Sequence, residues 1–153
     1  MKKYNNLWDK ICNIDNFKLA YKNATRGKKY YTEVKEIEKY GVDKYLVELL
    51  EEVVQNKYTV SEYTVFTRFT GDKVREIFKL PMKDRIIQHA IMIHIEPIFR
   101  ETFILDTYSS IKGRGIHRCL KRVKKSVKNT EYRYCLKLDI HKCYPSLDKD
   151  ILK

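Results

Sequence analysis

The sequence has few residues that break regular structure, with 5 glycines and 3 prolines among 153 residues. This scarcity excludes a flexible linker or low-complexity segment and favours long regular elements. The chain also lacks a hydrophobic run of the about 20 residues that cross a bilayer. Its basic start, Met1-Lys2-Lys3, is followed by no apolar stretch, which argues against a secretory signal. We therefore expect a soluble protein of the cytoplasm that does not enter membranes.

The 4 cysteines lie far apart and form no Cys-x-x-Cys pair; they are Cys12, Cys119, Cys135 and Cys143. Their spacing excludes a zinc knuckle and a Cys-x-x-Cys redox site. We expect reduced cysteines in or near the core, as is usual in the cytosol.

Basic residues are in large excess, with 32 Lys and Arg against 20 Asp and Glu and a formal net charge of +12. A charge of this sign and size points to a polyanionic partner. A content of 43% hydrophobic residues is nevertheless enough for a real core, and the length suits about one ordinary domain.

Acidic residues are absent from Ser109 to Thr130, where a Gly-containing loop leads into a predicted amphipathic helix. Such a run can be a merely solvated face, but charges of one sign repel each other unless a partner neutralises them, which favours a phosphate backbone. A membrane surface is the weaker alternative, because the apolar face of this helix has no aromatic anchor. The candidate nucleic-acid-binding residues are Lys112, Arg114, Arg118, Lys121, Arg122 and Lys125.

Periodicity predicts helices at both sides of one β-hairpin. The helices are expected from residue 7 to 24 with a break near Asp15-Asn16, at 32–39, at 45–54, and at 83–96 with Pro97 as the end. The hairpin is expected to pair Thr64–Thr70 with Val74–Leu80, and Gly71 supplies a positive φ in its turn. Asp84 is expected to cap the helix that follows.

Alternation of apolar and polar residues predicts a last strand over residues 132–140, with Asp139 near its carboxyl end. Ser146 or Asp148 is expected to cap a helix that begins just afterwards. Because the sequence stops barely one turn into that helix, we expect it to be a fragment. Its last strand would then be unpaired, and an unpaired strand predicts self-association of the isolated piece.

Sequence blocks in one fixed order across residues 64–148 resemble the reverse transcriptases. Asp139 with the aromatic Tyr144 five residues later resembles the first catalytic motif of that family. Upstream, the resembling blocks are Arg75–Ala90 for the fingers, Ile95–Phe99, and Tyr108–His117. The bacterial branch is the most similar, and the choice among group II intron, retron and diversity-generating retroelement enzymes stays open.

The resemblance implies an RNA-directed DNA polymerase that uses Mg²⁺ or Mn²⁺. Its expected partners are an RNA template with a DNA primer, dNTPs and a retroelement accessory protein. It makes Asp139 a catalytic metal ligand and gives the backbone carbonyl of Ile140 a part in holding the second metal. It makes Tyr144 the residue that selects dNTP over rNTP. Arg75 would grip the triphosphate through its planar guanidinium, assisted by Lys73. Each could instead be structural, with Asp139 capping, Tyr144 packing and Arg75 pairing across the hairpin.

One element of that family is missing from the sequence, the second palm motif with two adjacent aspartates. The only adjacent acidic pair is Glu51-Glu52, on a predicted helix. We therefore expect this chain alone to be inactive, and a non-catalytic RNA-binding module remains the alternative. The expected fold is α+β, with a helical extension at 1–57, fingers at 58–131, and the start of a polymerase palm at 132–153.

Overall fold

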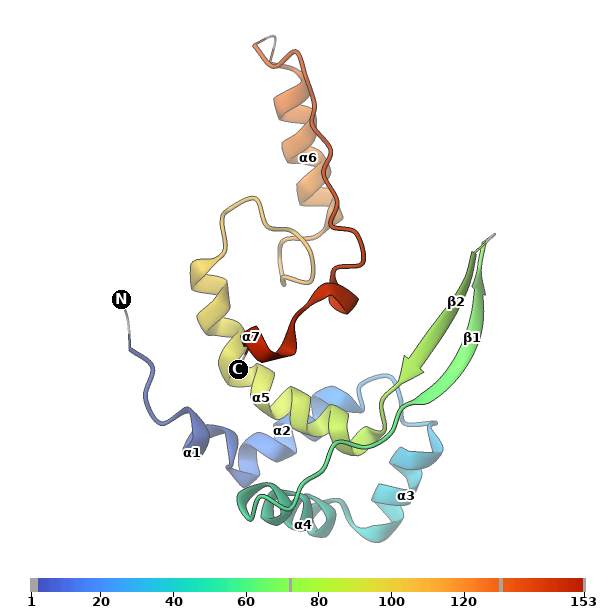
Figure 1. The fold of residues 1–153 in the computed structure, drawn as a ribbon. Coiled ribbons are helices and arrows are strands. Elements are labelled where there is room, and N and C mark those ends of the chain that lie inside the picture. Colours follow the sequence, from blue (N-terminus) through green and yellow to red (C-terminus); the bar gives the residue numbers. More distant parts are fainter. Residues whose placement is uncertain (1–2, 72, 130, 153) are drawn as a thin grey trace. The chain divides into compact units, whose positions relative to one another are not determined.

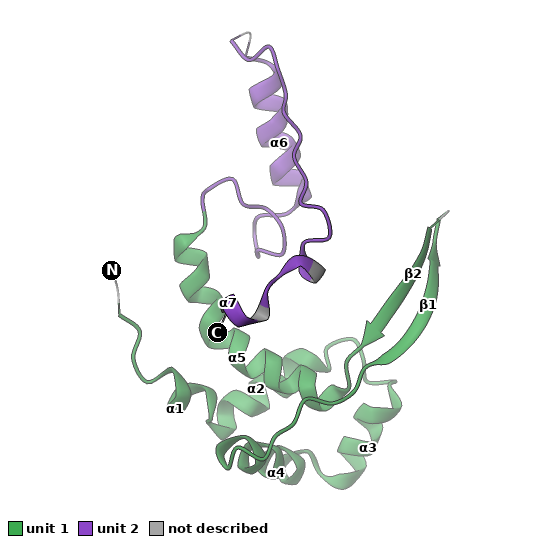
Figure 2. Ribbon diagram, viewed as in Figure 1, with its two compact units in different colours: residues 1–103 green, residues 104–153 purple. Residues whose placement is uncertain are grey.

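The chain folds into two compact units, residues 1–103 and residues 104–153 (Figure 2). The computed structural model describes residues 3–71, 73–129 and 131–152. Its fold is α+β, with helices and one two-stranded antiparallel sheet in the described part of the chain. The three segments expected from the sequence divide the chain at other points, and that division stays a prediction. Among the helices described, none is long and apolar enough to cross a membrane.

Five helices form the body of the first unit (Figure 1). They are α1 (Leu7–Ile11), α2 (Ile14–Ala24), α3 (Thr32–Tyr40), α4 (Val42–Val54) and α5 (Met82–Thr102). Helix α2 packs on both α4 and α5, and α3 packs on α4. The buried apolar side chains come from four of these helices and are Phe17, Ala20, Ala24, Val34, Ile37, Leu46, Leu49, Met82, Ile86, Ile87 and Ala90.

Three helix boundaries differ from the prediction by two or more residues, and one of them is the start of α4, which begins at Val42 and not at residue 45. The first break falls at residues 12–13, because Asn13 caps α2 by accepting a hydrogen bond of 2.8 Å from the amide of Asp15. Asn16, where the break was expected, is buried inside α2 and donates to the carbonyls of Ile11 and Ala90. Helix α5 continues to Thr102 beyond Pro97, since a proline removes one backbone donor without preventing the turns on either side.

The predicted hairpin is confirmed to within one residue. Strand β1 (Thr64–Thr70) pairs antiparallel with β2 (Lys73–Lys79), and the two project from the helices as an exposed arm (Figure 1). Gly71 has a φ of +59°, the positive value expected of it, while the adjacent Asp72 lies outside the described residues. A side chain at position 71 would strain this turn.

The second unit contains α6 (Ile116–Val127), a short 3₁₀ helix η1 (Tyr144–Ser146) and α7 (Lys149–Leu152). Asp148 caps α7, as expected, by accepting hydrogen bonds from the amides of Asp150 and Ile151. The strand expected at residues 132–140 is not formed, and this prediction is wrong for the chain as it stands. A strand is defined by its ladder of hydrogen bonds, and residues 132–140 have no ladder partner in the described chain.

Candidate nucleotide and nucleic-acid interface

The hairpin gathers basic side chains on one of its two faces. The pairing register sets Thr70 opposite Lys73 and Arg68 opposite Arg75. Side chains two residues apart along a strand share a face, so Arg68, Lys73 and Arg75 all lie on the same side. The structure therefore brings the two predicted triphosphate residues, Lys73 and Arg75, together.

Arg68 is the functional candidate that the sequence-based list of sites omits. It is exposed and directly opposes Arg75, although like charges facing each other across a ladder are destabilising. A bound polyanion would remove that repulsion. The sequence places Arg68 on the predicted hairpin, but only the register seen in the structure sets it opposite Arg75.

Two carboxylates hold the two ends of this hairpin to the helices. At the end of β2, Glu33 of α3 accepts from the ammonium of Lys79 at 2.7 Å and from the amide of Met82 at 2.6 Å. Before β1, Asp84 of α5 accepts from the amide of Ser61 at 3.1 Å and from the hydroxyl of Tyr58. Asp84 does not have the expected capping role, because Pro81 takes the N-cap position of α5 and no side chain caps it. Asp84 instead ties the segment that enters the hairpin to the helix that follows it.

Both anchoring carboxylates are held in their charged form. Burial raises the pKa of Asp84, but the hydrogen bonds from Tyr58 and Ser61 outweigh burial and leave that pKa below its ordinary value. Burial likewise raises the pKa of Glu33, and the contacts with Lys79 and Met82 bring it below its ordinary value. The pKa of Tyr58 is raised, by burial first and then by its hydrogen bond to Asp84.

The residues predicted for the catalytic end lie in the second unit and are open to solvent. Asp139 and Ile140 lie in the segment without regular structure, and Tyr144 begins η1 with 87% of its surface exposed. Tyr144 therefore does not pack inside its own unit. Asp139 has no hydrogen bond or ion pair with another described residue, so a purely capping role has no support within the part of the chain described.

The predicted metal ligands suit Mg²⁺ or Mn²⁺ in kind but not in number. A carboxylate and a backbone carbonyl are the hard oxygen donors that Mg²⁺ prefers. Asp139 is nevertheless a single carboxylate, and no group of three or more His, Cys, Asp or Glu side chains forms a metal cluster in the described ranges. The described residues therefore do not by themselves make a two-metal site, and we derive no reaction step through one.

Helix α6 carries a basic stripe along one face. The stripe comprises Arg118, Lys121, Arg122 and Lys125, which recur every three or four residues and line one hollow of about 450 Å³ together with Leu105, Asp106 and Tyr108. A groove lined by several cations is suited to the phosphates of a nucleic acid.

The six predicted nucleic-acid residues divide by what they touch. Arg114 donates to the carbonyls of Ile104 and Leu105, Arg118 donates to the carbonyl of Gly113, and Arg122 pairs with Asp106 at 3.3 Å. Arg114 thus closes the loop of residues 104–115 on itself, while Arg118 and Arg122 hold that loop to α6. Lys121 and Lys125 are exposed and have no hydrogen bond or ion pair with any residue that the structure describes. Lys112 is exposed in the turn before the helix.

Compared with models of known protein families and with curated protein sequences, the chain gives no match.

Proposed function

We propose that this chain is the nucleotide- and template-binding front portion of a bacterial RNA-directed DNA polymerase, a reverse transcriptase. The complete enzyme would work in the cytoplasm, where it extends a DNA primer on an RNA template with dNTPs. It would use Mg²⁺ or Mn²⁺ to stabilise charge at the transferred phosphate, with Asp139 as one ligand. The chain alone would bind substrates without joining them.

The observation that carries this proposal is the basic face of the hairpin. Arg75 and Lys73 were expected to bind a triphosphate from their place in an ordered set of sequence blocks, and the hairpin forms over the expected residues. The register adds Arg68 on the same face. Three cations on a projecting arm that is anchored at both ends suit a polyphosphate, because a preorganised cluster loses little freedom when the ligand binds.

The test is primer extension by the complete protein on an RNA template, compared with its Asp139→Ala variant. We expect near-complete loss of extension with the variant, because Asp139 would no longer hold a metal ion. Asp43→Ala is the matched control, since Asp43 is an exposed carboxylate that pairs only at the surface with Lys18. Equal extension by the Asp139 variant and the control would reject the assignment of Asp139.

A second candidate is a non-catalytic RNA-binding module, which the basic stripe of α6 favours. Such a protein would bind duplex RNA with a steep dependence on salt, because each neutralised phosphate releases counterions. It would extend no primer at any metal concentration. Extension by the complete protein would exclude this candidate, whereas salt-dependent binding without extension would favour it over the polymerase.

A further inference from the structure

The first unit has an acidic side that contrasts with the charge of the whole chain. Residues 32–54, which cover α3 and α4, contain seven of the chain's 20 acidic residues but only three of its 32 basic ones. This acidity has no use in binding a nucleic acid, which it repels. A basic partner is the occupant that such a surface attracts.

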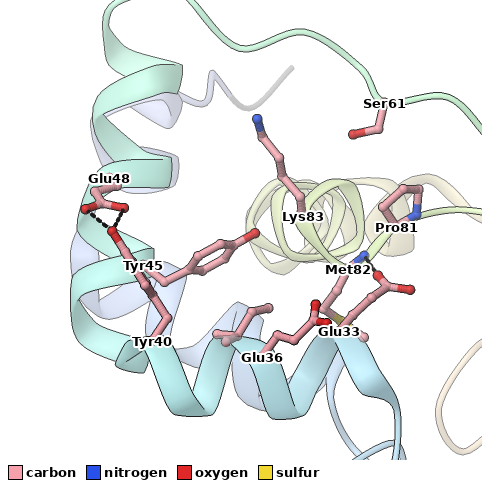
Figure 3. A pocket seen from close by; sticks show the side chains of 10 residues that line it. Glu33, Glu36, Tyr40, Tyr45, Glu48, Ser61, Pro81, Met82 and Lys83 are labelled. Atoms are coloured by element: carbon pink, nitrogen blue, oxygen red, sulfur yellow. Dashed lines mark hydrogen bonds between the residues drawn. The ribbon is translucent and has the colours of Figure 1, made fainter.

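The acidic side surrounds a pocket of about 640 Å³ whose lining is mostly apolar (Figure 3). The pocket is lined by Glu33, Glu36, Ile37, Tyr40, Tyr45, Glu48, Ser61, Pro81, Met82 and Lys83. Figure 3 shows the ring of Tyr45 reaching across it from α4 toward Lys83. The pocket thus combines an apolar floor with carboxylates at its edge, which suits a side chain that has an apolar stem and a cationic end.

Two of these carboxylates, Glu36 and Glu48, form no ion pair with any described residue. Glu33 is paired with Lys79, and Lys83 is paired with Glu52 at 2.6 Å. Glu48 accepts hydrogen bonds from the hydroxyl of Tyr40 at 2.8 and 2.9 Å, a contact with no cation.

Glu36 is exposed and has no hydrogen bond or ion pair among the residues described. It lies one helical turn before Tyr40 on α3, and Tyr40 is the residue that binds Glu48. Lys44 lies 4.6 Å from the ring centre of Tyr40, which shows that this aromatic ring already attracts an ammonium group.

The complementary surface is present in the same sequence, on α6. Lys121 and Lys125 lie one turn apart, are exposed and have no ion-pair partner within the described residues. The apolar Leu120 and Val123, which are about half exposed, lie on the other, apolar face of the same helix. Each of the two lysines has an apolar stem and a cationic end, which fits an apolar pocket with an acidic edge.

We propose that the pocket between α3, α4 and the start of α5 receives helix α6 of a second copy of this chain, with Lys121 and Lys125 against Glu36 and Glu48. Two molecules of charge +12 repel each other as wholes. At about 0.15 M salt, however, charges are screened beyond about 8 Å, so contact between an acidic and a basic patch can outweigh the repulsion. The association is therefore local and specific to these two surfaces.

The test is sedimentation equilibrium of the chain at about 0.15 M salt, with charge reversals on each surface. The double variants Glu36→Lys/Glu48→Lys and Lys121→Glu/Lys125→Glu should each self-associate at least about tenfold more weakly than the unmodified chain, since attraction becomes repulsion. Mixed in equal amounts, the two variants should form a heterodimer. The control Glu38→Lys/Glu51→Lys makes the same change of charge on α3 and α4 outside the pocket and should associate like the unmodified chain.

Three outcomes would overturn the proposal. The first is that the unmodified chain is a monomer at every concentration. The second is that the Glu36→Lys/Glu48→Lys variant associates as strongly as the unmodified chain. The third is that the two mixed variants do not pair, although each has the circular dichroism and the unfolding midpoint of the unmodified chain. Unaltered association would point instead to the unpaired segment at residues 132–140.

A second experiment, which rests on the proposed function, asks whether RNA competes with dimer formation for α6. If Lys121 and Lys125 also bind phosphates, a short RNA duplex should dissociate the dimer. Failure of RNA to compete, with the charge-reversed pair intact, would reject the RNA site on α6 and leave the docking established.

Discussion

Asp84 is a buried carboxylate, 1% exposed, that connects two segments far apart in the sequence. Its Oδ1 receives the amide of Ser61 and the hydroxyl of Tyr58, while its Oδ2 has no hydrogen-bond partner in the described structure. A buried charge is tolerated only when hydrogen bonds compensate for its lost hydration. The base of the hairpin therefore depends on this one side chain more than on any exposed pair.

Replacing Asp84 by Ala should lower the free energy of unfolding by about 1–3 kcal/mol, because two donors would lose their acceptor. Asp84→Asn keeps one acceptor oxygen, so its free energy of unfolding should lie between those of Asp84→Ala and the unmodified chain. Urea unfolding measures both. The control Asp43→Asn removes an exposed partner of Lys18 and should change stability by less than about 1 kcal/mol. Equal effects of Asp84→Ala and Asp43→Asn would contradict the anchoring role.

The two lowered carboxylate pKa values predict how stability responds to acid. For a carboxylate whose pKa falls on folding, the added stability is fully present above the unfolded pKa and is lost as pH falls through the folded one. Asp84 and Glu33 should therefore stabilise the first unit at neutral pH, and this contribution should begin to decline below about pH 4 and be lost as the pH falls through the lowered folded pKa values. Unfolding midpoints measured from pH 7 to pH 3 should fall less steeply in the double variant Glu33→Gln/Asp84→Asn. Parallel curves for the variant and the unmodified chain would show that other groups control the acid response.

At the scale of elements, the sequence predicts what local interactions decide. The hairpin was predictable because Gly71 specifies the turn and alternation specifies the strands. The segment at 132–140 has equally strong alternation, yet no strand forms, because a ladder needs a partner that periodicity cannot supply.

Some residues of the candidate site were likewise predictable from the sequence, and others were found only in the structure. Arg75 and Lys73 were identified from sequence, whereas Arg68 emerged only from the register. The contacts of Arg114 and Arg122 with the loop before α6 are tertiary, and no sequence pattern contains them.

Because Arg68 and Arg75 face each other, we expect that removing one of them stabilises the hairpin but weakens the binding of a dNTP. Arg68→Thr removes one like charge from a cross-strand pair and should stabilise the hairpin by about 0.2–1 kcal/mol. The same change should weaken the binding of a dNTP about tenfold or more, since a charge-assisted contact of about 1.5–3 kcal/mol is lost. Calorimetry with dGTP and with dGMP would separate contact with the distal phosphates from contact with the base and sugar. Thr67→Ser, on the other face, is the control; weaker dGTP binding by it, or unaltered binding by Arg68→Thr, would argue against a triphosphate site on this face.

At the scale of the whole molecule, charge is divided into an acidic side on α3 and α4 and a basic stripe on α6. If RNA binds to α6 and does not simply respond to the net charge of the chain, the effect of removing lysines on RNA affinity should depend more on their position than on their number. Lys121→Gln/Lys125→Gln should reduce the slope of log affinity against log salt by about 2, one for each phosphate contact.

Lys35→Gln/Lys39→Gln removes the same charge from α3 and should leave that slope nearly unchanged. Arg122→Gln should have a smaller effect than either lysine of α6, because Asp106 already offsets its charge. Fluorescence anisotropy with a short RNA duplex, at several salt concentrations, measures all three. Equal slopes for the two lysine pairs would mean that RNA responds to the total charge of the chain, and α6 would then be no distinct binding surface.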